Sequence, residues 1–221
     1  MATNYSPRIV TDGLICCVDG GDPKSYAGSG TVWTDRVSAS NNFTLNGSPA
    51  HDSTEGSFSF NNNPWAKSAN TSLLTASYTK VVWFYPLSTC ANIVSGGSSD
   101  GQHAFWMKST SDTLYAGHNG SWELVSHRPN PSGDMLNQWW CGIVTFDTSV
   151  GWVLYLNGEQ VDSNSATTAF TGSGAVRIAA YDDGVNLFNG KIAAVQIYNR
   201  AITAAEVTQN FSAFRGRFGL T

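Results

Sequence analysis

Short runs of β-forming residues, each followed by Gly, Asn, Asp, Ser or Pro, recur along most of the chain, and this pattern limits the fold more than any other feature. Between two of the runs stands Asn157-Gly158, the strongest short signal for a two-residue hairpin turn. Closely spaced strands with almost no helical periodicity between them are typical of antiparallel sheets packed face to face. The sequence therefore predicts an all-β sandwich, with strands at residues 13–18, 57–60, 80–85, 103–107, 113–116, 139–146, 151–156, 159–161, 176–181 and 190–198.

The C-terminal end carries the one helical pattern. Thr203-Ala-Ala-Glu206 forms a capping box, in which the Thr hydroxyl and the Glu carboxylate satisfy first-turn amides. Gly216 is predicted to end the helix. Because no linker, repeat or change of composition interrupts the chain, residues 1–221 are predicted to form one domain, with the helix and tail at about 203–221. The apolar residues that follow the capping box at spacings of four and three are Val207, Phe211 and Phe214.

Charged residues make up only 13% of the chain, about half of the roughly 25% that is typical of globular proteins. The net charge of −4 lacks the electrostatic footprint of a nucleic-acid binder or of a protein that binds anionic membranes. No apolar run approaches the ~18–20 residues of a membrane-spanning helix, so no membrane insertion is expected. The first residues lack the pattern of a signal peptide, and we expect the chain to be made and folded in a cytoplasm.

The final third of the chain carries five motifs in order. They are IVTFD at 143–147, VLYLNGEQV at 153–161, FNGKI at 188–192, VQIYNRAI at 195–202 and AEV at 205–207. In this order they resemble the concanavalin A-like, laminin-G-like jelly-roll family, and the N-terminal half matches more loosely. The resemblance implies an antiparallel jelly-roll β-sandwich of the concanavalin A-like type.

The last residues add a more specific resemblance. QNF at 209–211 and RGRFG at 215–219 are similar to the tail of stand-alone domains of this family in virion proteins of tailed phages. This similarity implies a non-catalytic virion structural protein, a capsid decoration or a tail- or fibre-type subunit, that is made in the host cytoplasm and acts as a surface adhesion module. Its partners would be other virion proteins, capsid or tail, or further copies of itself.

The tail also supplies side chains suited to such an interface, because aromatic and arginine side chains anchor most protein interfaces. The alternative is that these side chains pack on the domain itself. The predicted interface residues are Phe211, Phe214, Arg215, Arg217 and Phe218.

A carbohydrate-binding, lectin-like module is the second functional hypothesis, and a host surface glycan would be its partner. Aromatic faces bury the C–H side of a sugar ring while nearby polar groups bond its edge. Turns such as Gly117-His-Asn-Gly120 are placed to expose aromatic side chains. The alternative is packing in the core, or for the histidine an ordinary strand-face position. The candidate ligand-binding residues are Trp106, Tyr115, His118 and Trp122.

A calcium ion would assist such a module, although no cofactor is required by the sequence. Directly after a predicted strand, Asp182, Asp183 and Asn186 offer two carboxylates and an amide within five residues, and hard oxygen ligands of this kind suit calcium. A solvated Asp-Asp-Gly turn is the alternative interpretation.

An enzyme is not expected. The same fold hosts β-glucanases, whose paired carboxylates sit on one strand as E-x-D-x-x-E, and this chain contains no such string. A glycan hydrolase, with carboxylates converging from separate strands, is kept as the third hypothesis.

Overall fold

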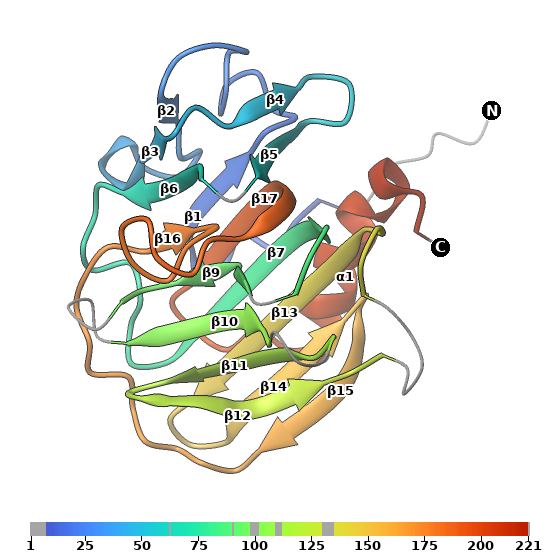
Figure 1. Cartoon of the computed structure of the whole chain (residues 1–221). Helices are drawn as coiled ribbons and strands as arrows, with labels where there is room; N and C mark the ends of the chain where they lie inside the picture. Colours follow the sequence, from blue (N-terminus) through green and yellow to red (C-terminus); the bar gives the residue numbers. More distant parts are fainter. Residues whose placement is uncertain are drawn as a thin grey trace.

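The computed structural model describes residues 8–61, 63–89, 91–97, 102–108, 112–129 and 135–220, and strands supply most of their regular structure (Figure 1). The strands are β1 (Leu14–Asp19), β2 (Val32–Trp33), β3 (Phe43–Asn46), β4 (Ala50–Asp52), β5 (Ser57–Asn61), β6 (Trp65–Ser68), β7 (Tyr78–Pro86), β8 (Ala91–Asn92), β9 (Val94–Ser95), β10 (His103–Met107), β11 (Leu114–His118), β12 (Ser121–His127), β13 (Trp140–Asp147), β14 (Gly151–Leu156), β15 (Glu159–Asn164), β16 (Arg177–Ile178) and β17 (Asn189–Tyr198). The helical elements are η1 (Ala39–Asn41), α1 (Ala204–Phe214) and η3 (Arg215–Phe218). The prediction of an all-β fold with one short C-terminal helix is confirmed.

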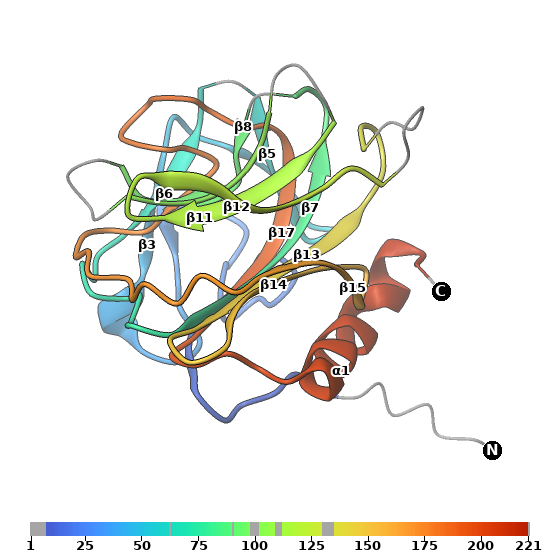
Figure 2. The ribbon, with the colours of Figure 1, turned by 90° about the horizontal axis from the view of Figure 1, so that it is seen from below.

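The larger sheet has the strand order β15-β14-β13-β7-β17-β5-β4, with β1 also paired to β17. The pairing is antiparallel, and Val82 of β7 lies opposite both Val195 of β17 and Gly142 of β13. β7 and β17 lie at the centre of this sheet and are buried on both faces, which explains their nearly continuous apolar sequences. The view in Figure 2 shows this sheet between the second strand layer and α1.

The second layer consists of two sheets, with the orders β12-β11-β10-β8 and β2-β3-β6-β16-β9. A bridge between Gly96 and His103 links them. In β10 successive side chains alternate between the faces, so Phe105 and Met107 enter the core between the layers while Trp106 lies on the outer face. The two facing antiparallel layers form the jelly-roll β-sandwich that the resemblance implied.

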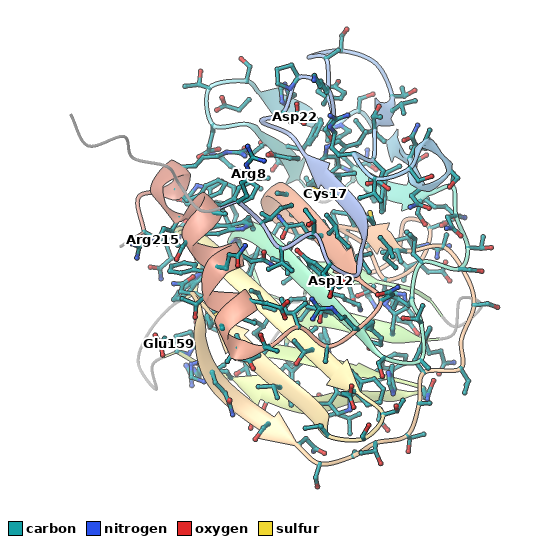
Figure 3. The ribbon with its side chains drawn as sticks, turned by 180° about the vertical axis from the view of Figure 1, so that it is seen from behind. Arg8, Asp12, Cys17, Asp22, Glu159 and Arg215 are labelled. Carbon is teal, nitrogen blue, oxygen red and sulfur yellow. The ribbon has the colours of Figure 1, made fainter. Side chains whose placement is uncertain are left out.

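Helix α1 begins at the predicted capping box: Glu206 N–H donates to Thr203 Oγ1, and the Glu206 carboxylate accepts from Thr203 N–H. The helix lies across the back of the larger sheet, with Arg215 at its C-terminal end (Figure 3). The prediction that Gly216 ends the helix is not met. α1 ends at Phe214, and the chain continues through Gly216 in η3. Gly219 ends η3, and its φ of 69° suits a glycine. Among the described residues no helix is long and apolar enough to cross a membrane.

The C-terminal aromatic residues form a second core with this outer sheet face. Trp83 of β7 stacks on Phe211 with ring centroids 5.8 Å apart and on Phe218 with centroids 4.8 Å apart. Phe218 is only 9% exposed and also contacts Trp139. Phe214 is half-buried on the same cluster. These side chains therefore pack on their own domain, which was the alternative to a partner interface.

The arginines of the tail divide into two kinds. Arg217 donates to the backbone carbonyls of Glu55 and Gly56 and forms an ion pair with Asp19 at 2.7 Å, so its guanidinium ties the tail to the sheet. Arg215 is exposed. The predicted partner interface is therefore corrected. Phe211, Arg217 and Phe218 are engaged within the chain, whereas Arg215 and part of Phe214 face outward.

Candidate functional site

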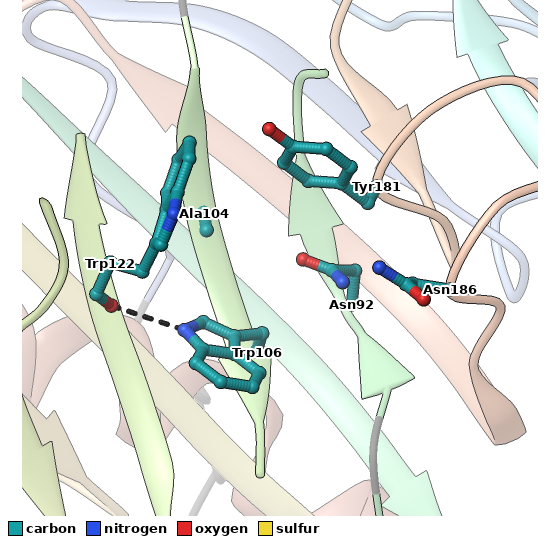
Figure 4. Close-up of a pocket in the computed structure, with 6 residues that line it drawn as sticks. All are labelled: Asn92, Ala104, Trp106, Trp122, Tyr181 and Asn186. Atoms are coloured by element: carbon teal, nitrogen blue, oxygen red, sulfur yellow. Dashed lines mark hydrogen bonds between the residues drawn. The ribbon is translucent and has the colours of Figure 1, made fainter. Parts of the chain in front are cut away.

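A cavity of about 220 Å³ opens on the outer face of the second layer, beside the loop that follows β16. Its walls come from β8, β10, β12 and this loop (Figure 4). Three aromatic rings and two amide side chains surround a single small residue. The lining residues are Asn92, Ala104, Trp106, Trp122, Tyr181 and Asn186.

Strand register places the central tryptophan of this cavity. Trp106 lies directly opposite Asn92 of β8 on one side and Tyr115 of β11 on the other. Its indole Nε1–H donates to the backbone carbonyl of Trp122 at 3.1 Å, which fixes the orientation of the ring. Two residues before it on the same face, Ala104 has too small a side chain to fill the space above the sheet.

Behind Trp106, away from the cavity, a row of side chains supports the ring. The rings of Trp106 and Tyr115 are stacked with centroids 5.4 Å apart. The ammonium of Lys108 lies over Tyr115 at 5.4 Å and is paired with Glu123 at 2.8 Å. Tyr115 therefore does not line the cavity but packs against a residue that does, a contact that holds Trp106 in place.

A glycine bulge brings the second tryptophan to the cavity. The register of β11 and β12 shifts between Ala116 and His118, and a Cβ on Gly117 would lie 1.8 Å from the carbonyl oxygen of Ser121. Only glycine permits this approach. The bulge and the turn after it position Trp122, whose ring meets that of Tyr181 edge to face at 5.6 Å. β12 itself was not predicted from the sequence.

The loop between β16 and β17 contributes Tyr181 and Asn186. Its backbone is closed by a hydrogen bond from Tyr181 N–H to the carbonyl of Val185, and the carbonyl of Asn186 accepts from Asn92 N–H. The Asn92 side-chain oxygen accepts from Ser95 Oγ at 2.7 Å, which orients its amide nitrogen as the free donor group. Both amides therefore offer polar atoms beside the aromatic rings (Figure 4).

The predicted calcium ligands anchor this loop. Arg177, which is 2% exposed, pairs with Asp182 at 3.1 Å and with Asp183 at 2.7 Å, and Lys67 pairs with Asp183 at 2.9 Å. Burial raises the pKa of Asp183, but the hydrogen bonds from Lys67 and Arg177 outweigh it and hold that pKa below its usual value. The described residues contain no group of three acidic, histidine or cysteine side chains placed to hold a metal. Asn186 lies at the cavity, and calcium binding stays a prediction.

The prediction that His118 contacts a ligand is wrong. His118 is 2% exposed and points into the core, where its Nδ1 lies 3.2 Å from the Tyr78 hydroxyl and its Nε2 lies 2.9 Å from the Thr168 carbonyl. Burial lowers its pKa to about 4. The sequence already indicated that Tyr115 and His118 cannot share a ligand on one face. The two residues are three positions apart in one strand, so their side chains lie on opposite faces of the sheet.

Sequence reasoning therefore found the two tryptophans of the cavity, named Asn186 for a different role, and missed Asn92, Ala104 and Tyr181. Tyr181 ends a predicted strand directly before the Asp-Asp-Gly turn, a position from which an aromatic ring reaches the surface. Asn92 carries no signal in the sequence, because its place depends on the register of β8 with β10.

Two antiparallel layers with a helix on the back of one sheet define the protein as a jelly-roll β-sandwich. A family model described as the concanavalin A-like lectin/glucanases superfamily matches residues 60–208. The chain belongs to this superfamily. No curated protein matches the sequence significantly.

Solved structures share the fold at low sequence identity. Domain 4 of an extracellular arabinanase from Geobacillus stearothermophilus, in complex with arabinotriose, is 16% identical with a TM-score of 0.67, over 89% of this chain and 97% of that one. The binding domain of botulinum neurotoxin DC in complex with SialylT is 10% identical with a TM-score of 0.69, over 91% and 51%. A Trypanosoma rangeli sialidase in complex with sialic acid is 12% identical with a TM-score of 0.67, over 97% and 36%.

Proposed function

We propose that the protein is a non-catalytic, lectin-like adhesion module that binds a glycan in the cavity around Trp106. The observation that carries the proposal is the combination of Trp106, Trp122 and Tyr181 with two side-chain amides in one open cavity. The aromatic rings would bury the apolar face of a sugar, and Asn92 and Asn186 would bond its hydroxyl groups. Such a site needs no metal.

Preorganisation supports this assignment. The Trp106 ring is held by its hydrogen bond to Trp122 and by its stack on Tyr115, so little conformational entropy is lost when a ligand binds. The comparisons are in keeping with it, since structures of similar fold were solved in complex with arabinotriose, SialylT and sialic acid.

Binding without catalysis is favoured by the chemistry of the cavity wall. A retaining glycosidase needs two carboxyl groups about 5–5.5 Å apart at the scissile bond. The six lining residues include no carboxylate, and the nearby Asp183 is engaged by Arg177 and Lys67. Release of reducing sugar from any bound glycan would overturn the non-catalytic part of the proposal and favour the hydrolase.

The setting proposed for this module is the surface of a tailed-phage virion, where host glycans are met. It is supported by the resemblance of residues 209–211 and 215–219 to virion domains. Because most of the C-terminal side chains pack inward, contacts with other virion proteins would use other surfaces together with Arg215. Antibody labelling of purified particles tests this setting, and an absence of label on particles would contradict it.

A glycan array followed by titration calorimetry tests the binding. We expect saturable binding that Trp106→Ala or Trp122→Ala weakens by about tenfold or more, which corresponds to about 1.4 kcal/mol. Trp65→Ala is the matched control, because Trp65 is a half-buried tryptophan on β6 outside the cavity. Unchanged affinity in both cavity variants would refute the assignment of the site.

A further inference from the structure

The charges around the cavity indicate which class of glycan it accepts, an inference that rests on the proposed function. We propose that the cavity binds uncharged sugar units and discriminates against acidic ones, such as sialic or uronic acids. A site for an acidic sugar needs a cation or a set of donors aimed at the carboxylate, and the placement of the cations in this chain argues against such a site.

The positions of all cationic side chains are described. The chain has 12 Lys and Arg and 4 His residues, and each of them lies in the described part of the sequence. None of them lines the cavity, whose walls are aromatic, amide and methyl groups. A sugar carboxylate in this cavity would therefore meet no counter-charge from the wall.

The cations nearest to the cavity already have anionic partners. Arg177 lies beneath the loop that carries Tyr181, is 2% exposed and pairs with Asp182 and Asp183. Lys67 pairs with Asp183 as well. For either cation to reach a ligand, an existing ion pair would have to break, and the side chain of Arg177 is only 3% exposed.

Two further cations lie on the strands of the same sheet. Lys108 follows β10 and is paired with Glu123 at 2.8 Å behind Tyr115, on the side of Trp106 away from the cavity. Arg128 follows the end of β12, two residues beyond Ser126, which the register aligns with Tyr115 and Trp106, so it lies past Trp106 on the side away from Ala104 and the cavity. Neither is placed to contact a sugar that rests on Trp106.

The ion-pair cluster beside the cavity has two carboxylates and two cations, and so offers no net positive charge to an anion. Asp182 and Asp183 directly follow Tyr181, and the side chain of Asp183 is 49% exposed. An anionic sugar entering this cavity would therefore lose hydration without gaining a cationic partner. Structures of similar fold were solved in complex with SialylT and with sialic acid, and this cavity would differ from them in its ligand.

The test is an array of matched pairs, each a neutral oligosaccharide and the same oligosaccharide carrying sialic or glucuronic acid, followed by calorimetry on the strongest binder. We expect the neutral member to bind about tenfold or more tightly than its acidic partner. Its affinity should not change between about 50 mM and about 500 mM NaCl, over which the Debye length shrinks about threefold. Arg128→Met removes an exposed cation of the same sheet and should leave the neutral affinity within about twofold.

The outcomes separate this inference from the proposed function. Preferential binding of acidic glycans, weakened by salt or by Arg128→Met, would overturn the inference and leave glycan binding in place. Equal affinity for both members of each pair would overturn it as well. If no oligosaccharide binds while the protein is folded by circular dichroism, the proposed function itself fails.

Discussion

The core of the sandwich contains two histidines that make folding sensitive to acid, and His118 allows the effect to be worked out. His118 is 2% exposed, faces Tyr78, and has its pKa lowered to about 4 by burial. In the unfolded chain its pKa returns to about 6.5. Because the folded pKa is the lower one, the unfolded state binds more protons between these values. The contribution of His118 to the free energy of unfolding is therefore fully present above pH 6.5 and is lost as the pH falls toward 4.

The magnitude follows from the difference of about 2.5 pKa units, which corresponds to about 3.4 kcal/mol at most and about 2.5 kcal/mol by pH 4.5. His103, 1% exposed and 2.7 Å from the Lys80 ammonium, has its pKa lowered by burial and adds an effect of the same sign. Burial also lowers the pKa of Lys80, whose contribution has the same sign.

Urea unfolding at pH 7 and pH 4.5, compared between the natural chain and His118→Gln, isolates the contribution of this side chain. Removing the histidine lowers stability at pH 7, because Tyr78 and Thr168 lose their partner. The informative quantity is the decrease in the free energy of unfolding from pH 7 to pH 4.5, which we expect to be about 2.5 kcal/mol smaller in the variant. Keeping the pH at 4.5 or above limits the effect of Glu206, whose pKa of about 2 is held down by Arg200. Identical pH dependence in the two proteins would refute the reasoning.

Three further predictions concern the tail, the loop and calcium. Phe218→Ala should lower the free energy of unfolding by about 3 kcal/mol, because a ring packed on Trp83 is lost. Arg215→Ala, the control, should change it by less than about 0.5 kcal/mol. Equal effects of the two substitutions in urea titrations would contradict the described packing. Arg177→Met should weaken glycan binding about tenfold by releasing the loop that holds Tyr181, and unchanged affinity by calorimetry would show that the ion pairs do not position this wall. Bound calcium would raise the melting temperature in millimolar calcium over that in chelator, and equal values would contradict the calcium prediction.

Turn, capping and strand-pattern rules that use only neighbouring residues predicted the elements with clear sequence signals. The hairpin of β14 and β15 follows Asn157-Gly158, whose φ values of 51° and 86° are the left-handed pair that this turn requires. Helix α1 follows its capping box. By contrast β12 reads S-W-E-L-V-S-H, with weak alternation, and it forms because the bulge at Gly117 lets the chain fold back on β11.

The site was harder to predict because its members meet through tertiary structure. Trp106 and Trp122 could be proposed as exposed aromatic residues, but Tyr181 reaches them only because buried Arg177 fastens its loop through Asp182 and Asp183. The same acidic pair suggested calcium in the sequence, since a carboxylate cluster does not reveal whether a protein cation will be its partner. The alternation of side chains along the strand would, however, have placed His118 on the core face, opposite to Tyr115.

Nuclear magnetic resonance mapping of a bound neutral glycan tests the central claim most directly. If the cavity is the binding site, the largest shifts at saturation will be those of the indole N–H of Trp122 and the side-chain amides of Asn92 and Asn186, while the indole N–H of Trp65 will not move. Shifts that cluster instead at Trp139, on the side of the sheet covered by Phe218, would contradict the account.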